Sequence, residues 1–150
     1  MLAAVRRATA AEKAVLHEPE FAGREWDYVK ECIDTGWVSS VGKMVDRFEA
    51  MLAEFTGARR AVATVNGTAA LHIAVVLAGA GPGDEVIVPS LTFIATANAV
   101  SYAGAVPHFA DVAADTIGLD AAKLDAHLSD VARIGPSGCV NRVSGRPIKA

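Results

Sequence analysis

The fold class is easiest to recognise between residues 60 and 110, where the chain runs RAVATVNGTAALHIAVVLAGAGPGDEVIVPSLTFIATANAVSYAGAVPHFA. Three short apolar runs predict buried strands: 60–65, 85–89 and 105–109. The segments between them predict two helices: 69–79, which is apolar almost all round and is therefore expected to be buried, and 93–102. Glycine-containing turns separate these elements. The order strand, helix, strand, helix, strand is typical of an α/β layered fold with a mainly parallel sheet.

Two helices are predicted before this region. The first begins at Gly23 and ends near Gly36, and the second is amphipathic and ends at Gly57. The apolar face of the second helix consists of Val45, Phe48, Leu52 and Phe55. Residues 1–16 are expected to form a loose N-terminal arm, and 17–21 an extended or turn-like segment because Pro19 disfavours a helix just before it.

Three elements are predicted after it. They are a short surface helix at 121–131, a hairpin at 139–148, and the entry to a further strand at 147–150. A sheet of three strands is narrow and has unpaired edges, so we expect the chain to be part of a longer protein.

Composition limits the classes to which the chain can belong. Its 150 residues, 52% hydrophobic and 21% charged, suit one domain with a real core. The net charge of -3 gives no dominant basic surface, so a nucleic-acid partner is not expected. No run reaches about 18 apolar residues, so a membrane span is not expected either. Cys32 and Cys139 make no disulfide framework, which favours a reduced, cytoplasmic protein.

The first candidate binding segment is the strand-to-helix junction that contains Asn66, Gly67 and Thr68. The first N–H groups of a helix have no partners inside it and lie at the positive end of its dipole, so a phosphate or carboxylate can bind there. Thr68 adds a hydroxyl. The alternative is an ordinary cap made by Asn66 or Thr68.

The second candidate follows the strand at 85–89, again at its carboxyl end, where ligands bind in open α/β sheets. Phe93 offers a flat apolar face to a ring. The alternative is a core side chain at the start of a helix.

The third candidate is the loop at 36–42, in which Trp37, Ser39 and Ser40 lie between glycines. These side chains suit a sugar or phosphate; the alternative is a hydrophobic contact between two helices. The four histidines are scattered and show no metal-ligand spacing, and no hydrolase motif is present.

In this order and at this spacing, the motifs resemble the DegT/DnrJ/StrS family of sugar aminotransferases. They are GWVSS at 36–40, VxxFE at 45–49, NGTAALH at 66–72, PGDEV at 82–86 and PSLTFIATANA at 89–99. The closest resemblance is to the LegC-like branch, which aminates 4-keto nucleotide sugars on the way to legionaminic acid. Residues 17–21 and 139–148 also resemble that branch.

The resemblance implies part of a large domain of the aspartate aminotransferase-type fold (fold type I), spanning residues 17–150 and binding pyridoxal 5'-phosphate (PLP). It implies that Gly67, Thr68 and Ala69 hold the cofactor phosphate and that Phe93 stacks on its ring. It places Trp37, Ser39 and Ser40 near the nucleotide sugar. Glutamate is the implied amino donor, the 4-keto-6-deoxy sugar nucleotide the acceptor, and a homodimer the implied assembly.

The resemblance assigns no catalytic residue and no metal to this chain. The family lysine that carries the cofactor lies in a Ser-x-His-x-x-Lys context, which none of the five lysines has. Asp120 precedes a surface helix and does not match the family aspartate that pairs with the pyridine nitrogen. The chain alone is therefore expected to be an inactive N-terminal fragment. The alternatives are a sugar 3-dehydratase of the same fold, a non-catalytic module that binds a phosphorylated ligand, and a gene remnant.

Overall fold

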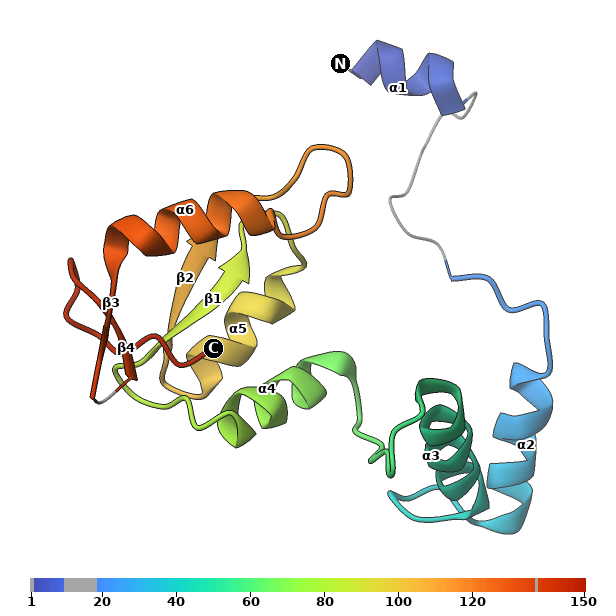
Figure 1. Cartoon of the computed structure of the whole chain (residues 1–150). Coiled ribbons are helices and arrows are strands. Elements are labelled where there is room, and N and C mark those ends of the chain that lie inside the picture. The colour runs from blue at the N-terminus through green and yellow to red at the C-terminus, as the bar shows by residue number, and fades with distance from the viewer. Residues whose placement is uncertain (1, 10–18, 137) are drawn as a thin grey trace. The chain divides into compact units, whose positions relative to one another are not determined.

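The computed structural model describes residues 2–9, 19–136 and 138–150 (Figure 1). Contacts divide the chain into two compact units, Met1–Ala63 and Thr64–Ala150, and each is described by itself. Within the predicted arm, α1 is a helix at Leu2–Thr9. The rest of that arm and part of the segment at 17–21 lie outside the described residues.

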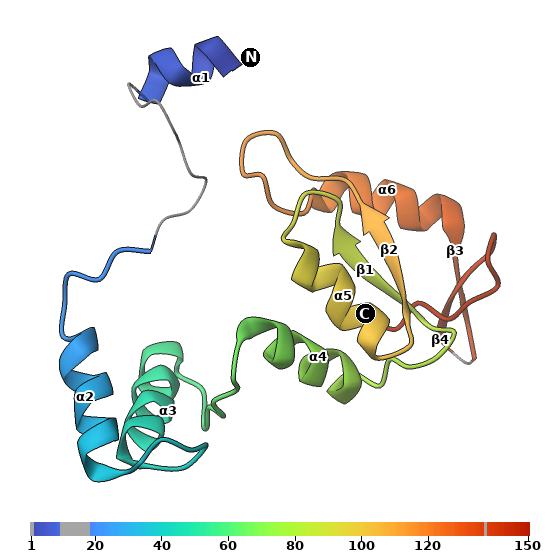
Figure 2. The ribbon, with the colours of Figure 1, turned by 180° about the vertical axis from the view of Figure 1, so that it is seen from behind.

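The first unit contains the two predicted helices, α2 at Glu25–Thr35 and α3 at Lys43–Thr56. Each ends at a glycine in the left-handed region, Gly36 with φ 74° and Gly57 with φ 71°, which confirms the predicted stops. The two helices lie side by side (Figures 1 and 2). The Lys43 ammonium on α3 pairs with the Glu31 carboxylate on α2, which joins the helices at the surface.

The second unit is built on a parallel pair of strands, β1 at Glu85–Pro89 and β2 at Val106–Ala110. Helix α5, Ile94–Tyr102, connects them. The segment at 147–150 runs beside the other edge of β1, where the Glu85 N–H donates to the Pro147 carbonyl at 2.7 Å and the Lys149 N–H to the Glu85 carbonyl at 2.9 Å. The predicted α/β layering, the parallel sheet and the strand entry at 147–150 are therefore confirmed.

Side chains on β1 alternate between the two faces of the sheet. Val86 and Val88 lie in the apolar core with Val100 of α5, and Ala80 and Ala105 complete it. Glu85 lies on the opposite face, where helix α6, Ala121–Val131, contributes a histidine contact. One face of the sheet is thus apolar and the other carries a buried polar group.

The predicted surface helix at 121–131 has the same bounds as α6. A hairpin follows it directly, with β3 at Ala132–Gly135 antiparallel to β4 at Gly138–Asn141, and the sequence did not predict β3. The predicted hairpin at 139–148 is also present: the chain reverses direction a second time, and Val140 and Pro147 form an antiparallel β-bridge.

The predicted buried strand at 60–65 is not formed. Val62 is 79% exposed and Val65 is 89% exposed. A strand exists through the hydrogen-bond ladder to a neighbour, and the described residues provide no neighbouring strand for this run. The run contacts α3 instead, where the Ala63 N–H donates to the Glu49 carboxylate at 2.7 Å.

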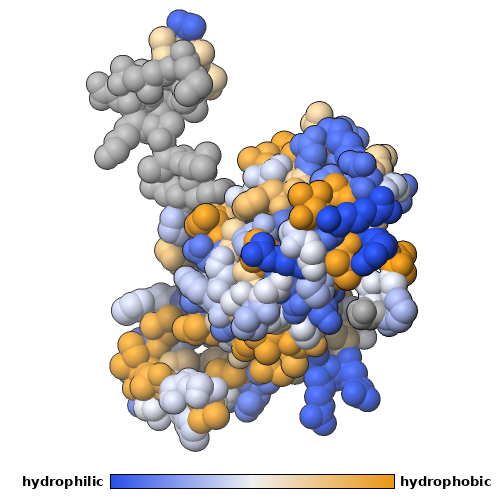
Figure 3. All heavy atoms as spheres, turned by 90° about the vertical axis from the view of Figure 1, so that its left-hand side faces the viewer, coloured by the Kyte–Doolittle hydropathy of each residue, from blue (hydrophilic) through white to orange (hydrophobic). Residues whose placement is uncertain are grey.

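The helix predicted at 69–79 is present as α4, Gly67–Leu77, but its expected burial is wrong. None of its residues is buried, and Leu77 is 80% exposed. An apolar sequence on every side of a helix requires cover on every side, and α4 packs on α5 along one side. Hydrophobic side chains of α4 therefore remain at the surface, Val76 and Leu77 among them. Figure 3 shows hydrophobic residues exposed on one face of the chain.

Candidate functional site

The start of α4 is capped by Asn66 and still offers free donors. Asn66 is extended, and its side-chain oxygen accepts from the Ala69 N–H at 2.9 Å. Within the described residues, the N–H groups of Gly67 and Thr68 have no acceptor. The cap and the anion site considered for this junction are therefore compatible, because Asn66 uses one of the exposed N–H groups and leaves two at the positive end of the dipole.

Phe93 immediately precedes α5 and is exposed. Its backbone is extended, with φ -70° and ψ 140°, and its side chain is 78% exposed rather than part of the core. The Thr92 and Thr96 hydroxyls lie 3.0 Å apart across the first turn. The Ser90 N–H donates to the Ala110 carbonyl at 2.8 Å, which ties together the carboxyl ends of β1 and β2 below this junction.

The structure brings the two junctions to one end of the second unit. The amino ends of α4 and α5 lie at the same end as the carboxyl end of β1 in both ribbon views (Figures 1 and 2). Gly67 and Thr68, at the start of α4, and Phe93, just before α5, therefore lie at the same end of the second unit. A planar ligand that carries an anionic group suits these donors chemically.

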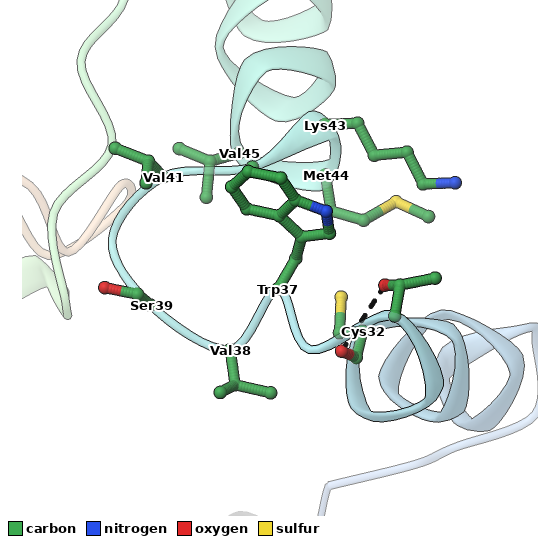
Figure 4. Close-up of a pocket in the computed structure, with 10 residues that line it drawn as sticks. Cys32, Trp37, Val38, Ser39, Val41, Lys43, Met44 and Val45 are labelled. Atoms are coloured by element: carbon green, nitrogen blue, oxygen red, sulfur yellow. Dashed lines mark hydrogen bonds between the residues drawn. The ribbon is translucent and has the colours of Figure 1, made fainter.

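The loop at 36–42 lines a pocket of about 230 Å³ in the first unit. Figure 4 shows the Trp37 ring lying against the start of α3, near Met44 and Lys43. Gly42, with φ 146°, permits this close approach, since a Cβ there would lie 3.3 Å from the Trp37 Cβ. Ser39 lines the pocket, and Ser40 belongs to the loop without being among the lining residues.

Three lysines are held in surface ion pairs. Lys123 pairs with Asp111 at 2.6 Å, Lys30 with Asp34, and Lys43 with Glu31. The hydrogen bond from Lys123 lowers the pKa of the Asp111 carboxyl, and the same bond raises the pKa of the Lys123 ammonium. All three ammonium groups are therefore partners of carboxylates at the surface.

A polar cluster that the sequence reasoning missed lies on the α6 face of the sheet. The Glu85 carboxylate, 4% exposed, accepts from Ser144 Oγ at 2.5 Å, His108 Nδ1 at 2.7 Å and Asn141 Nδ2 at 2.9 Å. Burial raises the pKa of Glu85, but these three hydrogen bonds outweigh it and hold the pKa below its ordinary value. The sequence does contain one signal for this cluster, which is a charged residue, Glu85, at the first position of the apolar run at 85–89.

Where the chain is described, no group of three His, Cys, Asp or Glu side chains is arranged to hold a metal ion. No helix in the described ranges is both long enough and apolar enough to cross a membrane.

The fold is a partial α/β domain with a parallel sheet, and comparison with known proteins identifies its class as that of the aminotransferases. The model of the DegT/DnrJ/EryC1/StrS aminotransferase family matches residues 19–133, so the chain belongs to that family. Within that family, the LegC-like branch stays a prediction.

Among curated relatives, the GDP-perosamine synthase of Caulobacter vibrioides is 56% identical over 108 residues, which are 72% of this chain and 29% of that protein. The GDP-perosamine synthase of Escherichia coli O157:H7 is 46% identical over 96 residues, 64% of this chain and 26% of that protein. The chain thus spans less than a third of the length of these relatives.

Solved structures of sugar aminotransferases share the fold. Spr1654 of Streptococcus pneumoniae, named as a sugar aminotransferase and solved in PLP and PMP forms, superposes with a TM-score of 0.65 at 30% identity, over 75% of this chain. The alignment covers 28% of the PMP-form chain and 29% of the PLP-form chain. A family aminotransferase of Brucella abortus gives a TM-score of 0.63 at 32% identity, over 85% of this chain and 31% of that one. The predicted fold class is confirmed.

Proposed function

We propose that this chain supplies the phosphate-binding and ring-binding part of a PLP-dependent nucleotide-sugar aminotransferase. The proposal rests on the amino ends of α4 and α5, which lie at one end of the second unit. There the N–H groups of Gly67 and Thr68 have no acceptor among the described residues, and Phe93 is exposed. The name of the relatives, GDP-perosamine synthase, supports a nucleotide-linked sugar as substrate class.

The donor set fits the phosphate and ring of PLP. Gly67 and Thr68 donate N–H groups, Thr68 adds its hydroxyl, and the helix dipole favours the negative charge. Phe93 gives the ring an apolar face, worth about 0.5–1.5 kcal/mol beyond area burial. Ala69 belongs to the same turn, but its N–H is already bonded to Asn66, so its contribution is close packing.

When bound, PLP supplies the electron sink that allows an amino group to move between substrates. The residues of this chain bind and orient it. The amino donor in the proposal is glutamate and the acceptor is a 4-keto-6-deoxy sugar nucleotide, which Trp37, Ser39 and Ser40 contact within a homodimer. The amino-sugar product belongs to polysaccharide biosynthesis.

We expect no turnover from these 150 residues alone, because none of the five lysines has the Ser-x-His-x-x-Lys context. Reading the gene beyond the codon for Ala150 separates the alternatives. That motif in frame supports the aminotransferase, whereas a histidine at the lysine position supports a sugar 3-dehydratase. A stop codon there would favour a binding module or a remnant.

The binding proposal is tested with pyridoxamine 5'-phosphate, which has no aldehyde and so does not react with surface lysines. Equilibrium dialysis of the full chain should give weaker binding for Thr68→Ala and Phe93→Ala. Pyridoxamine, which lacks the phosphate, should bind the Thr68→Ala variant as it binds the parent chain. Phe55→Ala is the matched control, since Phe55 is 89% exposed in the other unit. Equal affinity of the parent, Thr68→Ala and Phe93→Ala for pyridoxamine 5'-phosphate would reject the site.

A further inference from the structure

Phe93 lies between two points at which hydrogen bonds tie the chain. On its amino side, the Ser90 N–H donates to the Ala110 carbonyl at 2.8 Å. On its carboxyl side, the Thr96 N–H donates to the carbonyl of Phe93 itself at 3.0 Å. The hydroxyls of Thr92 and Thr96 lie 3.0 Å apart, so a second hydrogen bond spans the same residue. Phe93 is therefore enclosed by one backbone and one side-chain hydrogen bond, and both involve Thr96.

Packing does little to hold the Phe93 side chain. The side chain is 78% exposed, and those of its neighbours Leu91 and Ile94 are 59% and 65% exposed. The backbone changes at this point from extended at Phe93, with φ -70° and ψ 140°, to helical at Ile94. The direction in which the Phe93 ring leaves the chain therefore depends on how firmly this boundary is fixed.

Helix α5 lacks the usual means of fixing its first residue. Phe93 is the N-cap residue and has no side-chain oxygen to accept from the first turn. At the start of α4, by contrast, the Asn66 side chain accepts from the Ala69 N–H. The hydrogen bond between Thr92 and Thr96 crosses the boundary at α5 from the residue before Phe93 to the first turn of the helix.

A residue that is ordered before its ligand arrives binds that ligand at a lower entropic cost. Threonine suits this purpose, because its branched side chain has few rotamers and its hydroxyl can both donate and accept. The pair at Thr92 and Thr96 can therefore fix the boundary without any contact to the ligand.

We propose that Thr92 and Thr96 are positioning residues, whose shared hydrogen bond orders the backbone at Phe93 so that its ring is presented to the planar ring of the cofactor. The consequence for cofactor binding rests on the proposed function. The ordering of Phe93 is a property of the free chain and can be measured by itself.

Backbone amide NMR relaxation of the full chain measures the ordering without a ligand. The order parameter of the Phe93 amide should be about 0.85 in the parent, as in rigid backbone. It should be clearly lower in Thr92→Val and Thr96→Val, which keep the branched shape and lose the hydroxyl. Thr92→Ser keeps the hydroxyl and should restore the parent value. Thr56→Val is the matched control, because the Thr56 hydroxyl bonds the Leu52 carbonyl on α3.

Equal order parameters at Phe93 in the parent and in the two valine variants would overturn the proposal, whether or not the chain binds the cofactor. Equilibrium dialysis with pyridoxamine 5'-phosphate then measures the consequence for binding. Each valine variant should bind about two- to tenfold more weakly than the parent, the scale of one hydrogen bond. The double variant should bind no more weakly than either single variant, because both remove the same bond.

The effect on binding should also depend on the ring. In a Phe93→Ala background, Thr92→Val should cause no further loss of affinity, because no ring remains to be positioned. An undiminished loss in that background would overturn the positioning role. A parent chain that does not bind pyridoxamine 5'-phosphate would remove the proposed function, whereas valine variants that bind as tightly as a binding parent would remove only the role of the threonines.

Discussion

Asn66 has two roles that a single substitution can separate. Its side chain closes the first turn of α4, and its position beside Gly67 and Thr68 puts it next to the proposed phosphate. An N-cap needs an acceptor oxygen, whereas a phosphate site disfavours an added negative charge. Asparagine provides the acceptor without the charge.

We expect Asn66→Ala to lower the free energy of unfolding by about 1 kcal/mol, because the Ala69 N–H loses its acceptor. Asn66→Asp should keep that stability and weaken binding of pyridoxamine 5'-phosphate, since the carboxylate repels the phosphate. Urea unfolding and equilibrium dialysis of the same variants measure both effects. Unchanged stability of Asn66→Ala would show that the cap contributes nothing, and unchanged ligand binding by Asn66→Asp would remove the phosphate from this junction.

At the scale of elements, the apolar core between β1 and α5 contributes much of the stability of the second unit. Val100 is 1% exposed and lies in the cluster with Val86 and Val88. Close packing leaves a cavity when such a side chain is shortened.

Val100→Ala should therefore cost about 1.5–3 kcal/mol of unfolding free energy, the transfer energy of two methyl groups plus the cavity. Val62→Ala is the same chemical change at a residue 79% exposed, and it should stay within about 0.5 kcal/mol of the parent. Urea denaturation gives both values. A similar loss at the two positions would mean that the core does not lie where the structure has it.

The elements also show what sequence reasoning can and cannot reach. Local signals located β1, α5 and α6, because apolar periodicity and turn glycines act over a few residues. The run at 60–65 has the composition of a strand, but a strand needs a partner, and partner choice is not local. Composition likewise suggested that α4 is buried without showing what would cover it.

The candidate site and its surroundings likewise contain a part that the sequence could predict and a part that it could not. The junction at Phe93 follows from strand-to-helix order at the carboxyl end of β1. The strand predicted before Gly67 is not formed, so the sequence predicted the turn and helix start at Gly67 but not the strand that leads into it. The Glu85 cluster could not be assembled this way, because its partners Asn141 and Ser144 lie 56 and 59 residues further along the chain.

On the scale of the whole molecule, one buried carboxylate joins the parts of the second unit. Glu85 contacts β2 through His108 and the segment after β4 through Asn141 and Ser144. Its pKa is lowered because those hydrogen bonds outweigh burial. A group with a lowered pKa in the folded state contributes stability that is present above its unfolded pKa and lost as pH falls through its folded pKa.

We therefore expect the free energy of unfolding to decrease as the pH falls below 4.5, the ordinary value for this carboxyl. Glu85→Gln should be less stable at neutral pH and should show a smaller decrease in acid. Chemical denaturation at a series of pH values measures both, with Glu54→Gln, an exposed carboxyl on α3, as the control. An identical acid profile for Glu85→Gln and the parent would contradict the role given to this residue.

The hydrogen bonds between β1 and the segment at 147–150 also affect the order in which the elements can fold during synthesis on the ribosome. Helices α2 and α3 make local hydrogen bonds and can form as soon as they emerge. Glu85 cannot form its hydrogen bonds at that stage, because Asn141, Ser144 and the carbonyl of Pro147 are synthesised much later. Until then β1 has an open edge and a carboxylate without these donors, both exposed to solvent and to other chains. A pause in translation between β1 and β4 would prolong that exposure, whereas a pause before β1 would not.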